Sequence, residues 1–143
     1  MVAIQNASPE LKAFLERNPI VPGRGSVAGH AALERRTVHV HDVRTDPEYT
    51  WGITQIDPIR TVLMIPMLRS GELLGLIGVN RLEVRAFSDN QIALLQTFAD
   101  QAAIAIENVR LFKELQERTG QLSRSVDELT ALGRVSQALS STL

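Results

Sequence analysis

The chain has 143 residues, 44% of them hydrophobic, and a formal net charge of -1. This length suits one ordinary globular domain, and the near-neutral charge gives no footprint for nucleic acid or an anionic membrane surface. No apolar run reaches the roughly 18–20 residues of a membrane span, and no signal-peptide pattern is present. Cysteine is absent, which excludes disulfides, thiol nucleophiles, thiolate metal sites and thioether-linked chromophores. We therefore expect a cytoplasmic protein.

The chain opens with a predicted strand end and two short helices. Val2–Gln5 has the apolar content of a strand end. Ser8-Pro9 is typical of a helix N-terminus, and the proline after Asn18 predicts the end of that helix. A second helix is predicted over Ser26–Arg36. The Gly23-x-Gly25 pattern before it lacks a preceding strand and a following Gly-Lys-Ser/Thr, so we favour a turn over a phosphate-binding loop.

The next segment, Thr37–Val43, is predicted to be a strand with one polar face. His39 and His41 share that face, and with Asp42 beside them they have the residue types of a metal site. The remaining histidine, His30, stands at no recognised metal-ligand spacing from them. We favour a polar strand face without a metal.

The segment 44–60 is irregular and holds the single tyrosine and the single tryptophan of the chain, Tyr49 and Trp51. A long polar and aromatic connection is a natural pocket wall. The alternative is that both rings only pack the segment onto the sheet. We favour this alternative over a specific contact between either ring and a ligand.

Two apolar runs over Thr61–Arg81 flank Ser70-Gly71 and predict an antiparallel hairpin. Both parities are apolar, so both faces must be covered and the hairpin should form the middle of a sheet. The expected pairs are Arg69 with Glu72, Leu68 with Leu73, Ile65 with Leu76 and Leu63 with Gly78. Pro66 predicts a bulge or a local edge. Gly75 and Gly78 leave room for a helix, which we favour, or for a ligand.

The C-terminal part is predicted to be one long helix that begins at a capping box, Ser88 to Gln91. Its first apolar face should pack on the sheet and comprises Ile92, Leu95, Ala99, Ala102, Ile106 and Val109. A second stripe predicts a coiled coil and a homodimer. It comprises Ile104, Leu111, Leu115, Leu122, Leu129, Leu132 and Leu139. Gly120 and Gly133 weaken this helix, so we expect it to be continuous only when a partner supports it.

Several stretches resemble the GAF domain, a small-molecule-binding and dimerisation module of signalling proteins. They are Gly25–Ala32, Arg36–Val43, Asp46–Trp51, Arg60–Leu68, Gly75–Val79, Phe87–Asp89 and Phe98–Asn108. The likeness is to GAF units of bacterial multi-sensor or hybrid histidine kinases. It implies an α+β, profilin-like antiparallel sheet covered by helices, with a long C-terminal helix extending into a coiled coil.

The resemblance also implies a domain division. Residues 1–112 look like a GAF-like sensor domain whose first helix and strands are missing or reduced. Residues 113–143 look like a helical signalling linker, and Leu132–Leu143 resembles the opening helix of a following module.

Departures from the family pattern limit the ligands. In the cyclic-nucleotide subset a Lys–Asp pair holds the fold, and here Arg81 replaces the Lys while Gln91-Ile92 replace the Asp-Glu, although Asn80 and Phe87 match. This argues against a cyclic nucleotide. Covalent bilin and the chemistry of methionine-sulfoxide-reducing relatives both need cysteine, which is absent.

The resemblance leaves two functions open. One is a non-catalytic sensor, in a histidine kinase, that binds a small ligand and signals through the dimeric helix; the other is a structural dimerisation module without a ligand. We expect no catalytic residue, metal or cofactor. The candidate pocket residues are His39, His41, Tyr49, Trp51, Arg60, Met64, Pro66 and Gly78. Arg60 is either a partner for an anionic ligand or a solvated loop arginine.

Overall fold

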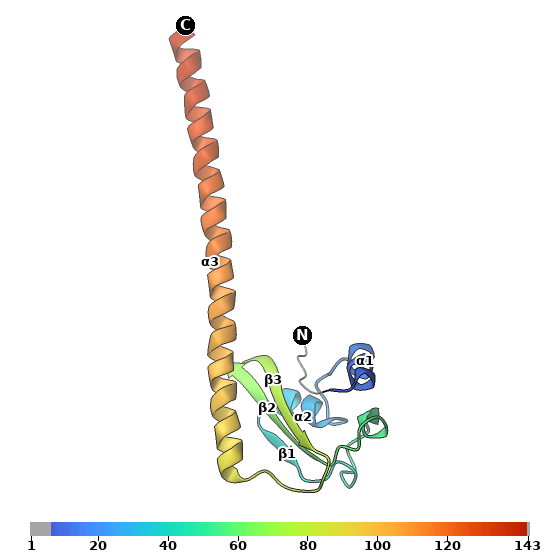
Figure 1. Ribbon diagram of the computed structural model, residues 1–143. Helices are drawn as coiled ribbons and strands as arrows, with labels where there is room; N and C mark the ends of the chain where they lie inside the picture. Colours follow the sequence, from blue (N-terminus) through green and yellow to red (C-terminus); the bar gives the residue numbers. More distant parts are fainter. Residues whose placement is uncertain (1–6, 143) are drawn as a thin grey trace. The chain divides into compact units, whose positions relative to one another are not determined.

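The computed structural model describes residues 7–142, so the strand end expected at Val2–Gln5 lies outside the described residues. In chain order its elements are α1 (Pro9–Arg17), α2 (Val27–Glu34), β1 (Val38–Val40), the 3-10 helix η1 (Gly52–Gln55), β2 (Thr61–Arg69), β3 (Glu72–Arg81) and α3 (Asp89–Thr142) (Figure 1). One compact unit ends at Ile104 and a second begins at Ala105. The domain boundary expected at residue 112 stays a prediction.

The predicted hairpin is present and forms the main part of an antiparallel sheet of order β1-β2-β3. Ser70 and Gly71 both have positive φ, 50° and 78°, which is the geometry of a type I′ turn. The pairs next to the turn are as predicted, Arg69 with Glu72 and Leu68 with Leu73. An irregularity between Met67 and Leu68 then shifts the register by one residue.

That shift corrects two of the expected pairs. Ile65 pairs with Ile77 instead of Leu76, and Leu63 pairs with Val79 instead of Gly78. The extra residue of the bulge is on β3. Each β3 side chain after it therefore points to the opposite sheet face from the one expected for a hairpin without a bulge.

Pro66 lies next to this bulge and beyond the reach of β1. The last β1 pair is Val38 with Met64, so the β1 side of Pro66 has no partner among the paired strand residues. Proline, which has no backbone N–H to donate, is tolerated in such a position. The predicted bulge and local edge are therefore both found here.

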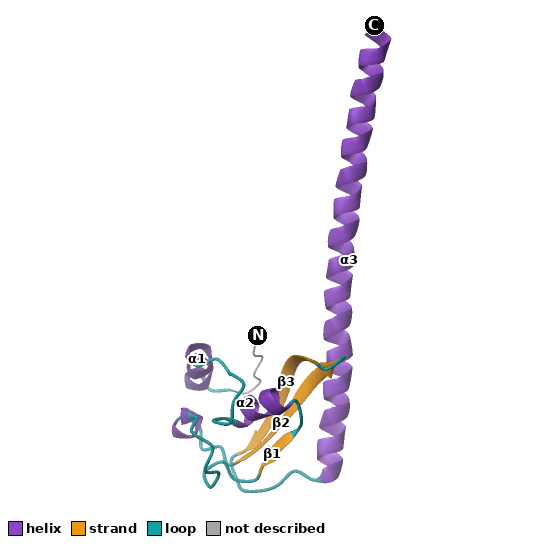
Figure 2. Cartoon of the chain, turned by 180° about the vertical axis from the view of Figure 1, so that it is seen from behind, coloured by secondary structure: helices purple, strands orange, loops and turns teal. Residues whose placement is uncertain are grey.

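Both faces of the hairpin are covered, as its apolar parities predict. On one face Val62 belongs to a core with residues of α1, α2, β1 and the 44–60 segment, and α2 lies across this face, behind the strands in Figure 1 and in front of them in Figure 2. On the other face Leu63 and Ile65 pack with Ala99 of α3.

The helix starts follow the predicted capping chemistry. The Ser8 hydroxyl accepts from Leu11 N at 3.1 Å, and the Ser26 hydroxyl accepts from Gly29 N at 3.0 Å. At α3 the capping box is complete, since Ser88 N donates to Gln91 Oε1 at 2.9 Å and Gln91 N donates to Ser88 Oγ at 3.2 Å. Arg81 Nη2 also donates to Gln91 Oε1, at 3.3 Å. The two residues that replace the family's charged pair therefore still contact each other.

Three expected elements differ from the structure. The strand predicted over Thr37–Val43 is limited to Val38–Val40, and the helix predicted over Ser26–Arg36 ends at Glu34, followed by Arg35 in the left-handed region. Along α3, Ile92, Leu95 and Ala99 face the sheet as predicted. The next buried residue is Ala103, whereas Ile106 and Val109 are 42% and 55% exposed. After Ala99 the face that contacts the sheet continues four residues on, at Ala103, and not three residues on, at Ala102 as predicted.

From Ala105 the chain is helical to Thr142, through Gly120 and Gly133. No helix in the described range 7–142 has the length and apolarity needed to cross a membrane.

Candidate functional site

The segment between β1 and β2 borders an open surface hollow of about 460 Å³. Its lining residues all come from this segment: Val43, Arg44, Asp46, Tyr49, Thr50, Trp51, Gly52, Thr54 and Gln55. This volume lies within the range of small-molecule sites. The pocket wall predicted for Tyr49 and Trp51 thus has a hollow beside it.

Backbone contacts with the loop before α2 position the aromatic wall. The amides of Thr50 and Trp51 both donate to the Gly25 carbonyl oxygen, at 3.0 and 3.1 Å. A Cβ on Gly25 would lie 2.8 Å from Thr50 Oγ1, so the close approach needs a glycine. The Gly23-x-Gly25 pattern therefore serves a packing role in this fold.

Trp51 also packs on α1. Its ring meets the ring of Phe14 edge to face, with centroids 5.5 Å apart. Tyr49 and Trp51 are both partly buried against the core on this side of the sheet, and burial raises the pKa of Tyr49 to about 12. Tyr49 is therefore a neutral phenol at physiological pH.

An ion pair closes the two ends of the segment. Arg60 donates from Nε to Asp42 Oδ1 at 2.9 Å and from Nη2 to Asp42 Oδ2 at 2.6 Å, which is a two-point contact. The hydrogen bond from Arg60, together with one from the Arg44 amide, lowers the pKa of Asp42 to about 2. Val43 N donates to the Arg60 carbonyl at 2.8 Å beside it. The Arg60 guanidinium is thus engaged by Asp42, a contact that neither sequence expectation included.

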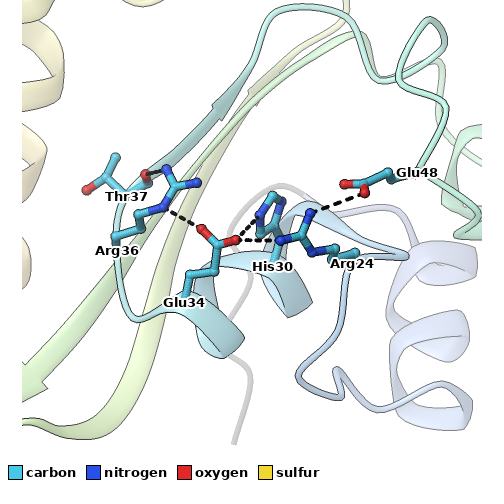
Figure 3. A network of polar contacts seen from close by, with 6 residues as sticks. All are labelled: Arg24, His30, Glu34, Arg36, Thr37 and Glu48. Atoms are coloured by element: carbon cyan, nitrogen blue, oxygen red, sulfur yellow. Dashed lines mark hydrogen bonds and ion pairs between the residues drawn. The ribbon is translucent and has the colours of Figure 1, made fainter.

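A polar network braces the segment from the side of α2 (Figure 3). The Glu34 carboxylate lies 2.9 Å from His30 Nε2, accepts from Arg24 at 3.2 Å and also accepts from Arg36. The contacts from His30 and Arg36 lower the pKa of Glu34. Arg24 reaches on to Glu48 at 3.3 Å, within the segment that lines the hollow.

The structure brings together only part of the predicted pocket. Met64, Pro66 and Gly78 lie on the sheet face that carries Trp51, but they do not line the hollow. A Cβ on Gly78 would lie 2.6 Å from Met64 Sδ and Cε, so this glycine makes room for a methionine and not for a helix. Gly75 makes room for Met67 in the same way, with 2.5 Å to its Cε.

His39 and His41 lie away from the hollow. The neighbouring residues Val38 and Val40 lie on the sheet face toward α2, so the two histidines point to the opposite face. There His39 Nε2 accepts a hydrogen bond from Phe87 N at 3.2 Å. Burial lowers the pKa of His39, with contributions from His41 and Arg81. Among the described residues no three His, Asp or Glu side chains form a group that could hold a metal ion.

Two supporting residues of the hollow were missed from the sequence. Asp42 pairs with Arg60, and extending the register of Val40 with Val62 by two residues would have placed them opposite each other. Gly25 was assigned only to a turn, because its contact with Thr50 joins two loops that share no periodic pattern.

The comparisons with known proteins agree with this fold. A family model described as GAF domain matches residues 2–107. The formate hydrogenlyase transcriptional activator FhlA of Escherichia coli (strain K12) is 29% identical over 83 residues, which is 58% of this chain and 11% of that protein. The chain thus spans about a tenth of the curated relative it matches.

Two solved structures extend the likeness. The GAF domain from a phosphoenolpyruvate-protein phosphotransferase of Coxiella burnetii is 25% identical with a TM-score of 0.57, over 63% of this chain and 54% of that one. The free methionine-R-sulfoxide reductase from Neisseria meningitidis, in complex with its substrate, is also 25% identical with a TM-score of 0.57, over 64% and 53%. Because the family model covers most of the chain and solved GAF domains share its fold, this chain belongs to the GAF domain family of regulatory and sensory domains.

Proposed function

We propose that this chain is a non-catalytic sensory module of a signal-transduction protein. It binds a small molecule in the hollow of the 44–60 segment and signals through a dimeric C-terminal helix. The observation that carries the proposal is the hollow itself, about 460 Å³ in volume and walled by Tyr49 and Trp51. Its wall is held by the backbone hydrogen bonds to Gly25 and by the Asp42–Arg60 pair, so it is formed before a ligand arrives.

The chemistry of the lining favours a small ligand with one flat apolar side and a polar edge. The two aromatic rings offer stacking surface, while Thr54 and Gln55 offer hydrogen-bonding groups. A non-catalytic role is supported by the absence of cysteine, since the sulfoxide-reducing relatives need it.

The second part of the proposal is a homodimer through α3, and it is supported by exposed leucines. Leu111, Leu115, Leu122, Leu129, Leu132 and Leu139 are 50–68% exposed in the single chain, while Ile104 is partly buried. Two further exposed residues, Phe112 and Val126, at 59% each, improve the pattern. With them, an apolar seam has the alternating steps of three and four residues that are typical of a coiled coil. It comprises Phe112, Leu115, Thr119, Leu122, Val126 and Leu129.

We propose that the output module is a histidine kinase, as the resemblance implies. The relatives supply other contexts, a transcriptional activator and a phosphotransferase. In each context the module would act by favouring one of two arrangements of the paired helices, which requires different ligand affinities in the two.

A structural dimerisation module without a ligand is the second candidate. It is favoured by the packing of Tyr49 and Trp51 against the core, because that burial alone gives both rings a role. The cytoplasm is the proposed location in either case.

Two variants separate the candidates. Trp51→Ala removes one of the two aromatic walls of the hollow, whereas Phe14→Ala removes the same edge-to-face contact but no lining residue. If the chain is a sensor, both variants should lose stability, but only Trp51→Ala should lose the bound small molecule. Native mass spectrometry after incubation with a metabolite extract measures this binding. If neither the wild type nor Phe14→Ala carries an added mass, the ligand proposal fails.

The dimer is tested separately by light scattering of the intact chain. Leu122→Glu places a charge in the seam and should give a monomer. Arg124→Glu, which changes a charge two residues away and outside the seam, should remain a dimer. A monomeric wild type, or a dimeric Leu122→Glu, contradicts the proposal.

A further inference from the structure

We propose that His39 is an acid-sensitive latch that holds the connection between β3 and α3 against the sheet. This goes beyond the proposed function, because the latch lies on the opposite sheet face from the hollow and needs no ligand.

The direction of one hydrogen bond fixes the protonation state of the latch. Phe87 N lies 3.2 Å from His39 Nε2. A backbone N–H can only donate, so Nε2 must carry a lone pair, and His39 is then neutral with its proton on Nδ1. Phe87 directly precedes Ser88, whose side chain caps α3. One ring nitrogen of β1 therefore fastens the chain at the point where α3 begins.

The groups around His39 disfavour a positive charge. The ring of His41, also on the β1 side, stands edge to face at 4.7 Å between centroids. From β3, the Arg81 guanidinium lies 4.2 Å from the centroid of the Phe87 ring, which is itself 5.7 Å from the His39 ring. α3 contributes apolar side chains, Ile92 and Leu95, to the same cluster. Burial lowers the pKa of His39, and His41 and Arg81 lower it further.

Protonation reverses the hydrogen-bonding role of Nε2. An imidazolium has an N–H at both ring nitrogens, so Nε2–H would face the Phe87 N–H and the bond would be lost. The new charge would also stand beside Arg81 and His41. The connection to α3 loses this anchor, while its contacts with Thr61 and the other hydrogen bonds of the sheet remain.

The pH range follows from the direction of the pKa shift. Because the folded-state pKa of His39 is lowered, the unfolded chain binds more protons than the folded chain. The stabilisation is complete above the ordinary histidine value of about 6.5 and is lost as the pH falls from there through the folded-state pKa.

Amide hydrogen exchange of the whole chain tests this latch. Between about pH 7.5 and about pH 5, after correction for intrinsic exchange, the peptide over residues 82–88 should lose about fivefold protection relative to β2, the factor expected for one net hydrogen bond. His39→Gln should show no such pH dependence, because an amide oxygen accepts at both pH values. The matched variant His41→Gln should keep the dependence, because it leaves the hydrogen bond between Phe87 N and His39 Nε2 in place.

Constant wild-type protection, or an unchanged pH dependence in His39→Gln, would overturn the proposal. A second measurement needs no variant. The nitrogen NMR spectrum of the wild type should show His39 Nε2 as unprotonated at neutral pH, and a proton on Nε2 there would also overturn it.

Discussion

Removal of the buried Thr61 hydroxyl should destabilise the chain more than the loss of any exposed hydroxyl. Thr61 is 0% exposed. Its Oγ1 donates to the His41 carbonyl at 2.6 Å, lies 3.0 Å from the Glu83 carbonyl and accepts from Arg85 N at 3.0 Å. One hydroxyl thus joins the chain after β1 to the connection that leads from β3 to α3.

Thr61→Val is the variant that isolates this effect, because valine has nearly the same shape. The loss then falls on hydrogen bonding, and each buried polar group left without a partner costs about 1–3 kcal/mol. Glu83 and Arg85 are exposed residues, so water can reach part of what is lost. We expect the free energy of unfolding to fall by about 2 kcal/mol, the equivalent of one full orphaned group.

Urea unfolding followed by the fluorescence of Trp51 measures this difference. The matched control is Thr97→Val, since the Thr97 hydroxyl donates to the Ala93 carbonyl at 3.0 Å on an exposed turn of α3. That control should stay within about 0.5 kcal/mol of the wild type. Thr61→Ser keeps the hydroxyl and should recover most of the loss. If Thr61→Val is no less stable than Thr97→Val, the role given to this hydroxyl is refuted.

Three further changes probe separate parts of the chain. Asp42→Asn should lower stability at neutral pH. The pKa of Asp42 is lowered from 3.8 to about 2 in the folded chain. The difference in free energy of unfolding between wild type and variant, measured by urea unfolding, should therefore be constant above about pH 5 and shrink as the pH falls toward 2. A constant difference at all pH values would contradict the ion pair with Arg60. Gly29→Ala should destabilise by about 1–3 kcal/mol in the same assay, because a Cβ there would lie 2.6 Å from the Val21 carbonyl oxygen. Gly133→Ala, with nothing within 4 Å of its Cβ, should instead stabilise α3 by about 1 kcal/mol in a circular dichroism melt, and a loss of helix would refute this.

Local chemistry made much of the fold predictable. Ser8 and Ser88 carry their structural roles in the side chain itself, and the Ser70-Gly71 pair adopts the positive φ values that a tight hairpin needs. The apolar parities of the hairpin correctly required cover on both faces, because a buried side chain on each side must find a partner wherever it is in the sequence.

The predictions failed where one extra residue or one turn decided the outcome. The bulge between Met67 and Leu68 shifted the later pairs, and no residue type in β3 marks which position is the extra one. In the candidate site, alternation along β1 correctly put His39 and His41 on one face. It did not say which face carries the hollow, because that depends on where the 44–60 segment folds back. Arg60 found its partner in Asp42 through the same fold-back.

In the proposed sensor, the hollow beside Trp51 binds a small molecule while α3 pairs two copies of the chain. Native mass spectrometry of the protein purified from cells and then incubated with a metabolite extract tests both parts at once. We expect a dimer with an added, releasable mass that Trp51→Ala lacks and Phe14→Ala retains. A dimer with no added mass would contradict the sensor and favour the structural module, and a monomer would contradict signalling through paired helices.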